Sequence, residues 1–155
     1  MYTIRTIFLY TLFITLTHIS LVSAEEIKTI QGKELAYFVS QNKGKPIFIT
    51  IFATWCPACR QEMPGIIATQ QKFSKEQITF IGISLDDNVE SLKNYIKQSK
   101  ITFPVYIAGS TIPSMFSITA IPHNIIYDKK GTLVMNKAGV LSASELNTML
   151  NKYTK

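Results

Sequence analysis

Short apolar runs and stretches with the periodicity of a helix alternate along this chain. Residues 47–52 form an apolar run rich in β-branched side chains, and chain breakers on both sides leave it too short for a buried helix. Such a run is typical of a central strand that is covered on both faces. Residues 78–85 predict a second buried strand, and residues 103–107 predict a short third one. Residues 109–117 form an irregular or weakly helical connection.

Helical periodicity fills the intervals between these runs. In residues 31–41, apolar side chains recur at the i, i+3 and i+4 positions of an amphipathic helix. Two further helices are expected to begin at a capping box, in which a polar N-cap side chain is paired with a glutamate three positions later. The two boxes are Asp87 with Glu90 and Ser142 with Glu145.

A β-hairpin is expected near the end of the chain. Residues 124–127 and 132–135 are strand-like, and the four residues Asp-Lys-Lys-Gly join them. Strands and helices then follow one another in the order βα, βα, ββα, which predicts an α/β domain with a mixed sheet. A length of 155 residues with 46% hydrophobic side chains allows one globular domain with a sizeable core.

The N-terminal residues have the pattern of a targeting segment. Arg5 precedes the uncharged, largely apolar residues 6–24, which end in Val-Ser-Ala. Small residues at the third and first positions before a break mark a signal-peptidase site, so residues 1–24 are predicted to be a signal peptide and residues 25–155 a thioredoxin-sized domain. The segment is also long enough to span a bilayer, which leaves an uncleaved N-terminal membrane anchor as the alternative. Both interpretations place the domain outside the cytoplasm, in the periplasm or an equivalent compartment.

The charge distribution excludes one class of partner. The formal net charge is +6, but the lysines are scattered and form no basic stripe interleaved with aromatic side chains. This pattern indicates a solvated surface, and no nucleic-acid partner is expected. Weak attraction to an anionic membrane surface remains open.

The candidate chemistry lies in residues 55–60, Trp-Cys-Pro-Ala-Cys-Arg, where a predicted strand turns into a helix. A thiolate at a helix N-terminus faces unpaired N–H groups and the positive end of the helix dipole, which lowers its pKa. Pro57 suits the first turn, and Pro64 is expected to kink the helix, which continues towards residue 73. We therefore expect Cys56 to be the exposed attacking thiol and Cys59 a sheltered one that resolves a mixed disulfide.

Other uses of a cysteine pair fit this sequence less well. A metal site would need two more ligands, and residues 25–155 offer only His123 as a further soft donor. Covalent haem attachment would need histidine where Arg60 stands, and a bridge that closes so short a loop constrains the unfolded chain little. A peroxidase would need a lone peroxidatic cysteine with threonine and arginine partners. Redox exchange without a cofactor is therefore the favoured chemistry.

Residues 53–64, Ala-Thr-Trp-Cys-Pro-Ala-Cys-Arg-Gln-Glu-Met-Pro, resemble the active-site segment of the thioredoxin-like superfamily. The pattern W-C-x-x-C-R-x-E-M-P is common among its extracytoplasmic TlpA-like thiol:disulfide reductases. The resemblance extends over roughly residues 27–153. It implies a thioredoxin fold, with a central mixed β-sheet flanked by helices. The long interval between Cys59 and Pro122 implies a TlpA-like strand-and-helix insertion.

The resemblance also implies roles for individual residues. Cys56 and Cys59 match the catalytic pair that forms the family's redox-active disulfide. Ile121-Pro122 resembles the family's cis-proline before the final hairpin, which leaves the backbone of residue 121 free to pair with an extended substrate. Side chains implied to support the site or contact substrate are Trp55, Pro57, Ala58, Ile121, Pro122 and His123.

Four polar positions near the motif were interpreted from the residues themselves. Thr50 stands where thioredoxins carry a buried acid, so no proton acceptor is assigned to Cys59. Glu62, like Arg60, is predicted to lie on the surface of the active-site helix, and Asp86 is predicted to be a cap or turn residue. His123 is either an ordinary strand-end residue or an imidazolium that stabilises the Cys56 thiolate.

The favoured function is that of a monomeric thiol:disulfide oxidoreductase that reduces disulfides of envelope proteins. Resemblance to the family implies protein thiols as substrates, with cytochrome c maturation as one setting, and a membrane thiol reductase as electron donor. Two alternatives stay open. One is a dithiol oxidase that introduces disulfides, and the other is a non-catalytic holding or assembly module that uses the thioredoxin surface.

Overall fold

Residues 26–154 are described by the computed structural model of this protein. The predicted signal peptide or anchor, residues 1–24, lies outside them. Within the described range, no helix is both long enough and apolar enough to cross a membrane.

One mixed sheet forms the centre of the described domain. Its strands are β1 (Thr29–Ile30), β2 (Ile47–Phe52), β3 (Thr79–Ser84), β4 (Val105–Ala108), β5 (His123–Tyr127) and β6 (Leu133–Ala138). They lie in the spatial order β1-β4-β3-β2-β5-β6. Strand β2 pairs in parallel with β3 and antiparallel with β5, and all six of its residues are buried. The central strand predicted from residues 47–52 is therefore confirmed.

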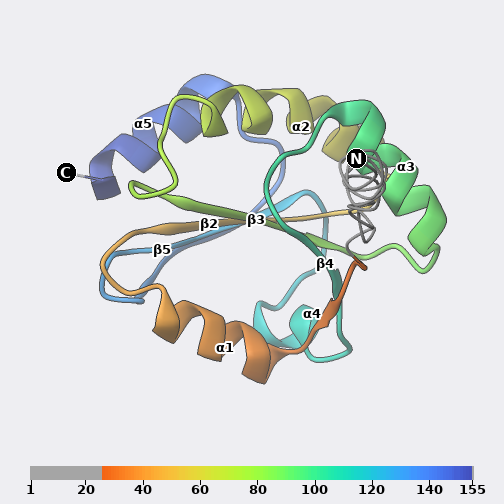
Figure 1. Ribbon diagram of the computed structural model, residues 1–155, viewed down its shortest axis with the longest axis horizontal. Helices are drawn as coiled ribbons and strands as arrows, with labels where there is room; N and C mark the ends of the chain where they lie inside the picture. The colour runs from red at the N-terminus through yellow and green to blue at the C-terminus, as the bar shows by residue number, and fades with distance from the viewer. Residues whose placement is uncertain (1–25, 155) are drawn as a thin grey trace, which may run out of the picture.

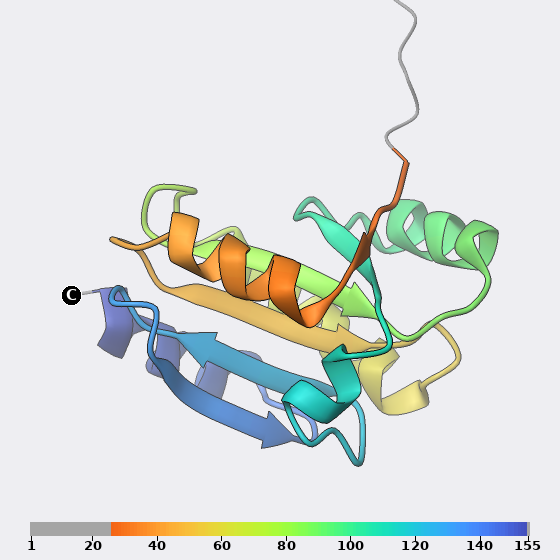
Figure 2. The same cartoon turned by 90° about the horizontal axis from the view of Figure 1, so that it is seen from below.

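Helices cover both faces of this sheet. They are α1 (Gly32–Gln41), α2 (Pro57–Gln70), α3 (Val89–Ser99), α4 (Ile112–Met115) and α5 (Ala143–Thr154). Figure 1 shows α2, α3 and α5 on one side of the sheet and α1 with α4 on the other. Figure 2, from the side of α1, shows the β5–β6 hairpin along one edge of the sheet. This arrangement confirms the predicted α/β thioredoxin fold, and the stretch β3-α3-β4-α4 contains the additional strand and helix.

Two apolar layers follow from the alternation of side chains along β2. Phe48 and Phe52 pack towards α2, α3 and α5, whereas Ile49 and Ile51 pack towards α1 and α4. Because successive strand residues point to opposite faces, a run of six apolar residues fills both layers at once. That double burial explains why the run shows no polar alternation.

Capping determines where two helices begin. Ser142 and Glu145 form the predicted box at the start of α5, with the Glu145 N–H donating to Ser142 Oγ and the Ser142 N–H to Glu145 Oε2. The predicted box of Asp87 with Glu90 is wrong by one residue. The N-cap of α3 is Asn88, whose side-chain oxygen accepts from the Ser91 N–H at 2.9 Å. Asp and Asn are about equally good caps, so the sequence alone does not separate these neighbours.

Element ends differ from the predictions in three further places. Strand β4 begins at Val105 instead of residue 103, directly after Pro104, which has no N–H to offer a ladder. Helix α2 ends at Gln70, short of residue 73, and Pro64 lies inside it. Strand β1 was not predicted, because two residues are too few to show a period.

Candidate active site

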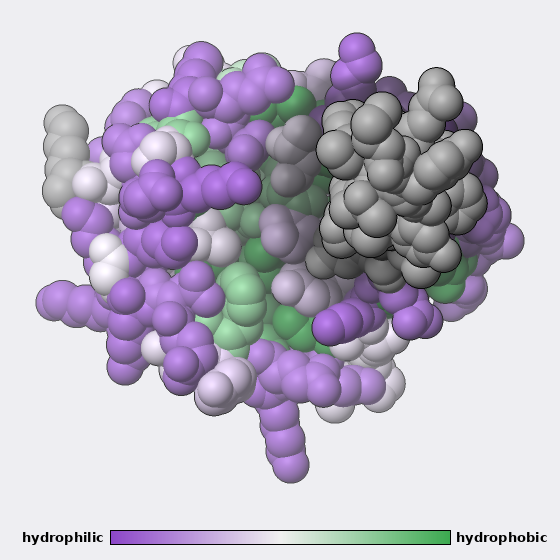
Figure 3. Space-filling model, viewed as in Figure 1, coloured by the Kyte–Doolittle hydropathy of each residue, from purple (hydrophilic) through white to green (hydrophobic). Residues whose placement is uncertain are grey.

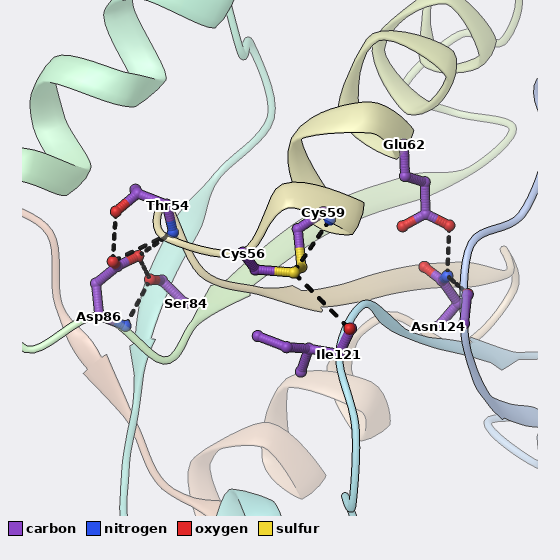
Figure 4. The surroundings of a disulfide bond; sticks show 9 residues. Thr54, Cys56, Cys59, Glu62, Ser84, Asp86, Ile121 and Asn124 are labelled. Carbon is purple, nitrogen blue, oxygen red and sulfur yellow. Dashed lines mark hydrogen bonds between the residues drawn. A yellow bond between two sulfur atoms is a disulfide. The ribbon is translucent and has the colours of Figure 1, made fainter.

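The disulfide lies where β2 turns into α2. Cys56 is the N-cap of α2, and its Sγ is bonded to that of Cys59. The Cys59 N–H donates to Cys56 Sγ at 3.1 Å. On the other side, Cys56 Sγ lies 3.8 Å from the carbonyl oxygen of Ile121, and the peptide bond between Ile121 and Pro122 is cis, as the resemblance implied. Figure 4 shows the sulfur atoms between the first turn of α2 and this loop.

Burial of the pair differs from the prediction. Cys56 is only 5% exposed and Cys59 1% exposed. The expectation of an exposed Cys56 is therefore wrong for the disulfide form, because the loop at residue 121 covers its sulfur. Trp55, directly before the pair, is 66% exposed and presents its ring to solvent, which suits the predicted docking surface. Pro57 is the first residue of α2, as expected, and Ala58 packs against the apolar core.

Glu62 is buried, and the prediction of a surface position is wrong. Its Oε1 accepts at 2.7 Å from Asn124 Nδ2 and at 2.7 Å from the backbone N–H of Leu141. Burial raises the pKa of this carboxyl above its ordinary value of 4.5, although the two hydrogen bonds act in the opposite direction. Glu62 follows Cys59 by three residues, so both side chains lie on one side of α2. That spacing is the signal by which sequence reasoning could have found it.

Beneath the disulfide, two polar side chains are paired across strands. Thr50 of β2 and Asn124 of β5 are register partners, and both are fully buried. Among the described residues, Thr50 Oγ1 and Asn124 Oδ1 have no hydrogen-bond partner. The site therefore contains a buried polar cluster of Glu62, Asn124 and Thr50 within an otherwise apolar layer. The carboxylate comes from α2 and not from the strand position at which thioredoxins carry it.

Asp86 holds the segment that leads into the cysteines. This side chain is buried, and its carboxylate accepts from the Thr54 N–H at 2.9 Å, from Thr54 Oγ1 at 2.5 Å and from Ser84 Oγ at 2.5 Å. Figure 4 shows Asp86 directed at Thr54 from the end of β3. Its interpretation as a cap or turn residue is wrong. No local signal marks this role, because 32 residues separate the partners.

His123 is buried and is bound away from α2. Its Nε2 lies 2.6 Å from Asn136 Oδ1 on the neighbouring strand, and Asn136 Nδ2 donates to the carbonyl of Phe116. Because His123 and Asn124 are successive strand residues, their side chains point to opposite faces of the sheet. Asn124 points to Glu62 on the α2 side, so His123 points to the α1 side. This placement favours the strand-end interpretation over contact with the Cys56 thiolate.

These features define a class of protein. A vicinal cysteine pair at the start of a helix, opposite a cis-proline loop and on a mixed sheet between two helical layers, is the arrangement of a thioredoxin-fold dithiol oxidoreductase. The comparison with protein families is consistent with this class. The AhpC/TSA family model matches residues 22–136, and the chain belongs to that family.

Curated relatives carry the matching activity in their names. Thiol-disulfide oxidoreductase ResA from Bacillus cereus is 29% identical over 129 residues, covering 83% of this chain and 73% of the relative. Sporulation thiol-disulfide oxidoreductase A from Bacillus subtilis is 24% identical over 124 residues, covering 77% of this chain and 73% of the relative. Together with the disulfide, these similarities identify the present chain as a thiol-disulfide oxidoreductase.

Solved structures agree on the fold. A thiol:disulfide interchange protein of the thioredoxin family from Chlorobium tepidum superposes with a TM-score of 0.69 at 29% identity, over 75% of this chain and 84% of that one. StoA from Bacillus subtilis superposes with a TM-score of 0.62 at 24% identity, over 74% of this chain and 85% of that one.

Proposed function

We propose that this protein reduces disulfides of other proteins outside the cytoplasm. The observation that carries the proposal is the Cys56–Cys59 disulfide at the N-terminus of α2, beside the free carbonyl of Ile121 and the exposed ring of Trp55. This arrangement suits a pair that cycles between disulfide and dithiol. The names of the relatives and the predicted N-terminal targeting segment support the same function.

The proposed cycle begins with the reduced pair. The Cys56 thiolate attacks one sulfur of the substrate disulfide, a mixed disulfide forms, and the other substrate sulfur leaves as a thiolate and takes up a proton. Cys59 then loses its proton and attacks the Cys56 sulfur. The bond to substrate breaks, the second substrate thiol is released, and the enzyme keeps the Cys56–Cys59 disulfide. Two electrons have passed to the substrate, and a dithiol donor returns two electrons to the enzyme.

Glu62 is proposed to accept the proton of Cys59. It lies one helical turn beyond that residue on the same side of α2, and its burial raises its pKa. A carboxylate with a raised pKa is a better base for a thiol than an ordinary one. This role fills the position that Thr50 leaves without an acid.

Substrate and donor are proposed from the resemblance. Apocytochrome thiols during cytochrome c maturation suit a reductase of this group, as do other oxidised envelope proteins. A membrane thiol reductase would supply the electrons. The domain would be secreted or held by residues 1–24 at the outer side of a bacterial inner membrane.

The decisive experiment is the reduction potential of the cysteine pair, followed through the fluorescence of Trp55, the single tryptophan. We expect a value near or below about −250 mV, at the thioredoxin end of the scale. A value near about −120 mV would assign the opposite direction, that of an oxidase. The double variant Cys56→Ala, Cys59→Ala serves as a control, because a holding module would keep its activity without the cysteines.

A further inference from the structure

A groove lies at the end of the sheet remote from the disulfide. It has a volume of about 680 Å³ and runs between the C-terminal turns of α1, α2 and α3 and the start of β4. Figure 3 shows hydrophobic surface in the middle of this face, bordered by hydrophilic side chains. The apolar side chains that line the groove include Phe38, Phe73, Phe80, Ile96, Ile101 and Phe103.

The groove contains an open strand edge. Strand β3 pairs with β2 along residues Thr79–Ser84, but with β4 only from Gly82 onwards. The Gly82 N–H donates to the Pro104 carbonyl, so Phe80, two residues earlier, directs its N–H and C=O to the same side. Pro104 has no N–H to donate to the Phe80 carbonyl, and the ladder stops there. Within residues 26–154, the first half of β3 has no strand partner on this edge.

The rim of the groove is basic. Glu26 is the only carboxylate among the described residues that line it. An adjoining hollow of about 320 Å³ shares Ile27, Ile96, Ile101 and Thr102 with the groove and is lined by further lysines. The lysines are Lys28, Lys45 and Lys75 in the groove and Lys93, Lys97 and Lys100 in the hollow.

From these observations we propose that the groove is a docking site for an extended, acidic segment of a partner polypeptide. The segment adds to the free edge of β3 through its backbone, places apolar side chains on the floor, and directs Asp or Glu side chains to the lysines. Added strands of this kind obtain affinity from main-chain hydrogen bonds and specificity from alternate side chains. A membrane surface fits the positive charge but not a concave site with an unpaired strand edge.

The site is separate from the redox centre. Strands β2 and β3 are parallel, the groove lies at their beginning, and the disulfide follows the end of β2. Binding is therefore tested with the Cys56→Ala, Cys59→Ala variant, so that its outcome does not depend on the proposed reductase activity.

The probe is a fluorescein-labelled peptide with a central run of valine and isoleucine and two glutamates at each end. We expect saturable binding by fluorescence anisotropy, and protection of the Phe80 amide against hydrogen exchange when the peptide is bound. Methylating alternate backbone nitrogens of the peptide should abolish binding, because a methylated nitrogen cannot donate to the β3 edge. The double variant Lys28→Glu, Lys75→Glu should weaken binding about tenfold.

Matched controls make the result specific. Lys33 and Lys130 are exposed and do not line the groove, so Lys33→Glu, Lys130→Glu changes the net charge equally and should leave binding unchanged. Absence of saturable binding, or binding that survives backbone methylation or the groove substitutions, would overturn the proposal. So would stronger attachment to phosphatidylglycerol vesicles than to the peptide. Protection of the Phe80 amide without added peptide would assign the groove to this chain's own N-terminal segment instead.

Discussion

At the scale of residues, two buried carboxylates approach the cysteine motif from different elements. Glu62 on α2 accepts hydrogen bonds from two N–H donors, but desolvation is the larger effect on its pKa, so its charged form is disfavoured. Asp86 at the end of β3 accepts from the backbone and hydroxyl of Thr54 and from the Ser84 hydroxyl. The first is suited to exchange a proton and the second to hold a loop.

The raised pKa of Glu62 predicts how stability depends on pH. The folded protein keeps the proton of this carboxyl to a higher pH than the unfolded chain, in which the pKa is about 4.5. The contribution of Glu62 to stability therefore falls as pH rises from that value through the folded pKa. In Glu62→Gln this loss should be absent, so the stability of the variant relative to the wild type should increase with pH. Urea unfolding of the oxidised proteins at several pH values tests this, and a difference independent of pH would contradict it.

Asp86 predicts a combined loss of stability and activity. In Asp86→Asn one acceptor becomes an amide donor that faces the Thr54 and Ser84 groups, which should cost about 1 to 3 kcal/mol of stability. The shifted Thr54–Trp55 segment should also slow disulfide exchange. Urea unfolding and an insulin reduction assay measure the two effects. Asp87→Asn, at the exposed neighbour, is the matched control, and equal effects at both positions would refute the role of Asp86.

His123 predicts a null result at the thiol. Because its ring is bound to Asn136 on the α1 side of the sheet, His123→Thr should leave the pKa of the Cys56 thiol unchanged. Titration of thiolate absorbance in the reduced protein measures this pKa. A clear shift of the pKa in the variant would restore the alternative in which the imidazolium stabilises the thiolate.

At the scale of elements, ends are decided by single backbone groups. Helix α2 begins at the disulfide because Cys56 caps it and Pro57 has no N–H that needs an acceptor. Strand β4 begins after Pro104 because proline cannot extend the ladder with β3. One such end therefore places the thiols at a positive helix terminus, and the other leaves the strand edge open in the groove.

The start of α3 allows a direct test of capping. Asn88 accepts the Ser91 N–H, so Asn88→Ala should lower stability by about 1 kcal/mol. Asp87→Ala should have a much smaller effect, because Asp87 is not the N-cap. Thermal unfolding of the two variants compares them, and a larger loss at Asp87 would show that the predicted box was right after all.

At the scale of the whole molecule, the sheet separates the two sites. The disulfide follows the end of β2, and the groove lies at the beginning of β3, about 20 Å away along a six-residue strand. No residue that lines the groove is in the cysteine motif or in the loop around Pro122. The fold can therefore hold a polypeptide at one end of the sheet while its disulfide is exchanged elsewhere.

This separation predicts independence of the two sites. The groove peptide should bind the oxidised and the reduced protein with the same Kd, and by linkage it should leave the reduction potential unchanged. Anisotropy titrations in both redox states provide the measurement. Different affinities in the two states would instead show that reduction changes the groove.

Sequence by itself determined the features that depend on local order. The apolar run at residues 47–52 can be satisfied only by burial on both faces, which predicts a central strand. The spacing of Cys56, Pro57 and Cys59 predicts a redox pair at a helix start, and family resemblance predicted the cis bond before Pro122. These properties need no knowledge of distant neighbours.

Tertiary structure alone decided which polar groups are buried and what they bind. Glu62 and Asp86 look like surface or turn residues until Asn124, Leu141 and Thr54 are brought to them by strand pairing and helix packing. The side of the sheet to which His123 points, and the open edge of β3, likewise depend on the register of neighbouring strands. A buried charge is tolerated only where distant donors meet it, so its role cannot be inferred before the fold is known.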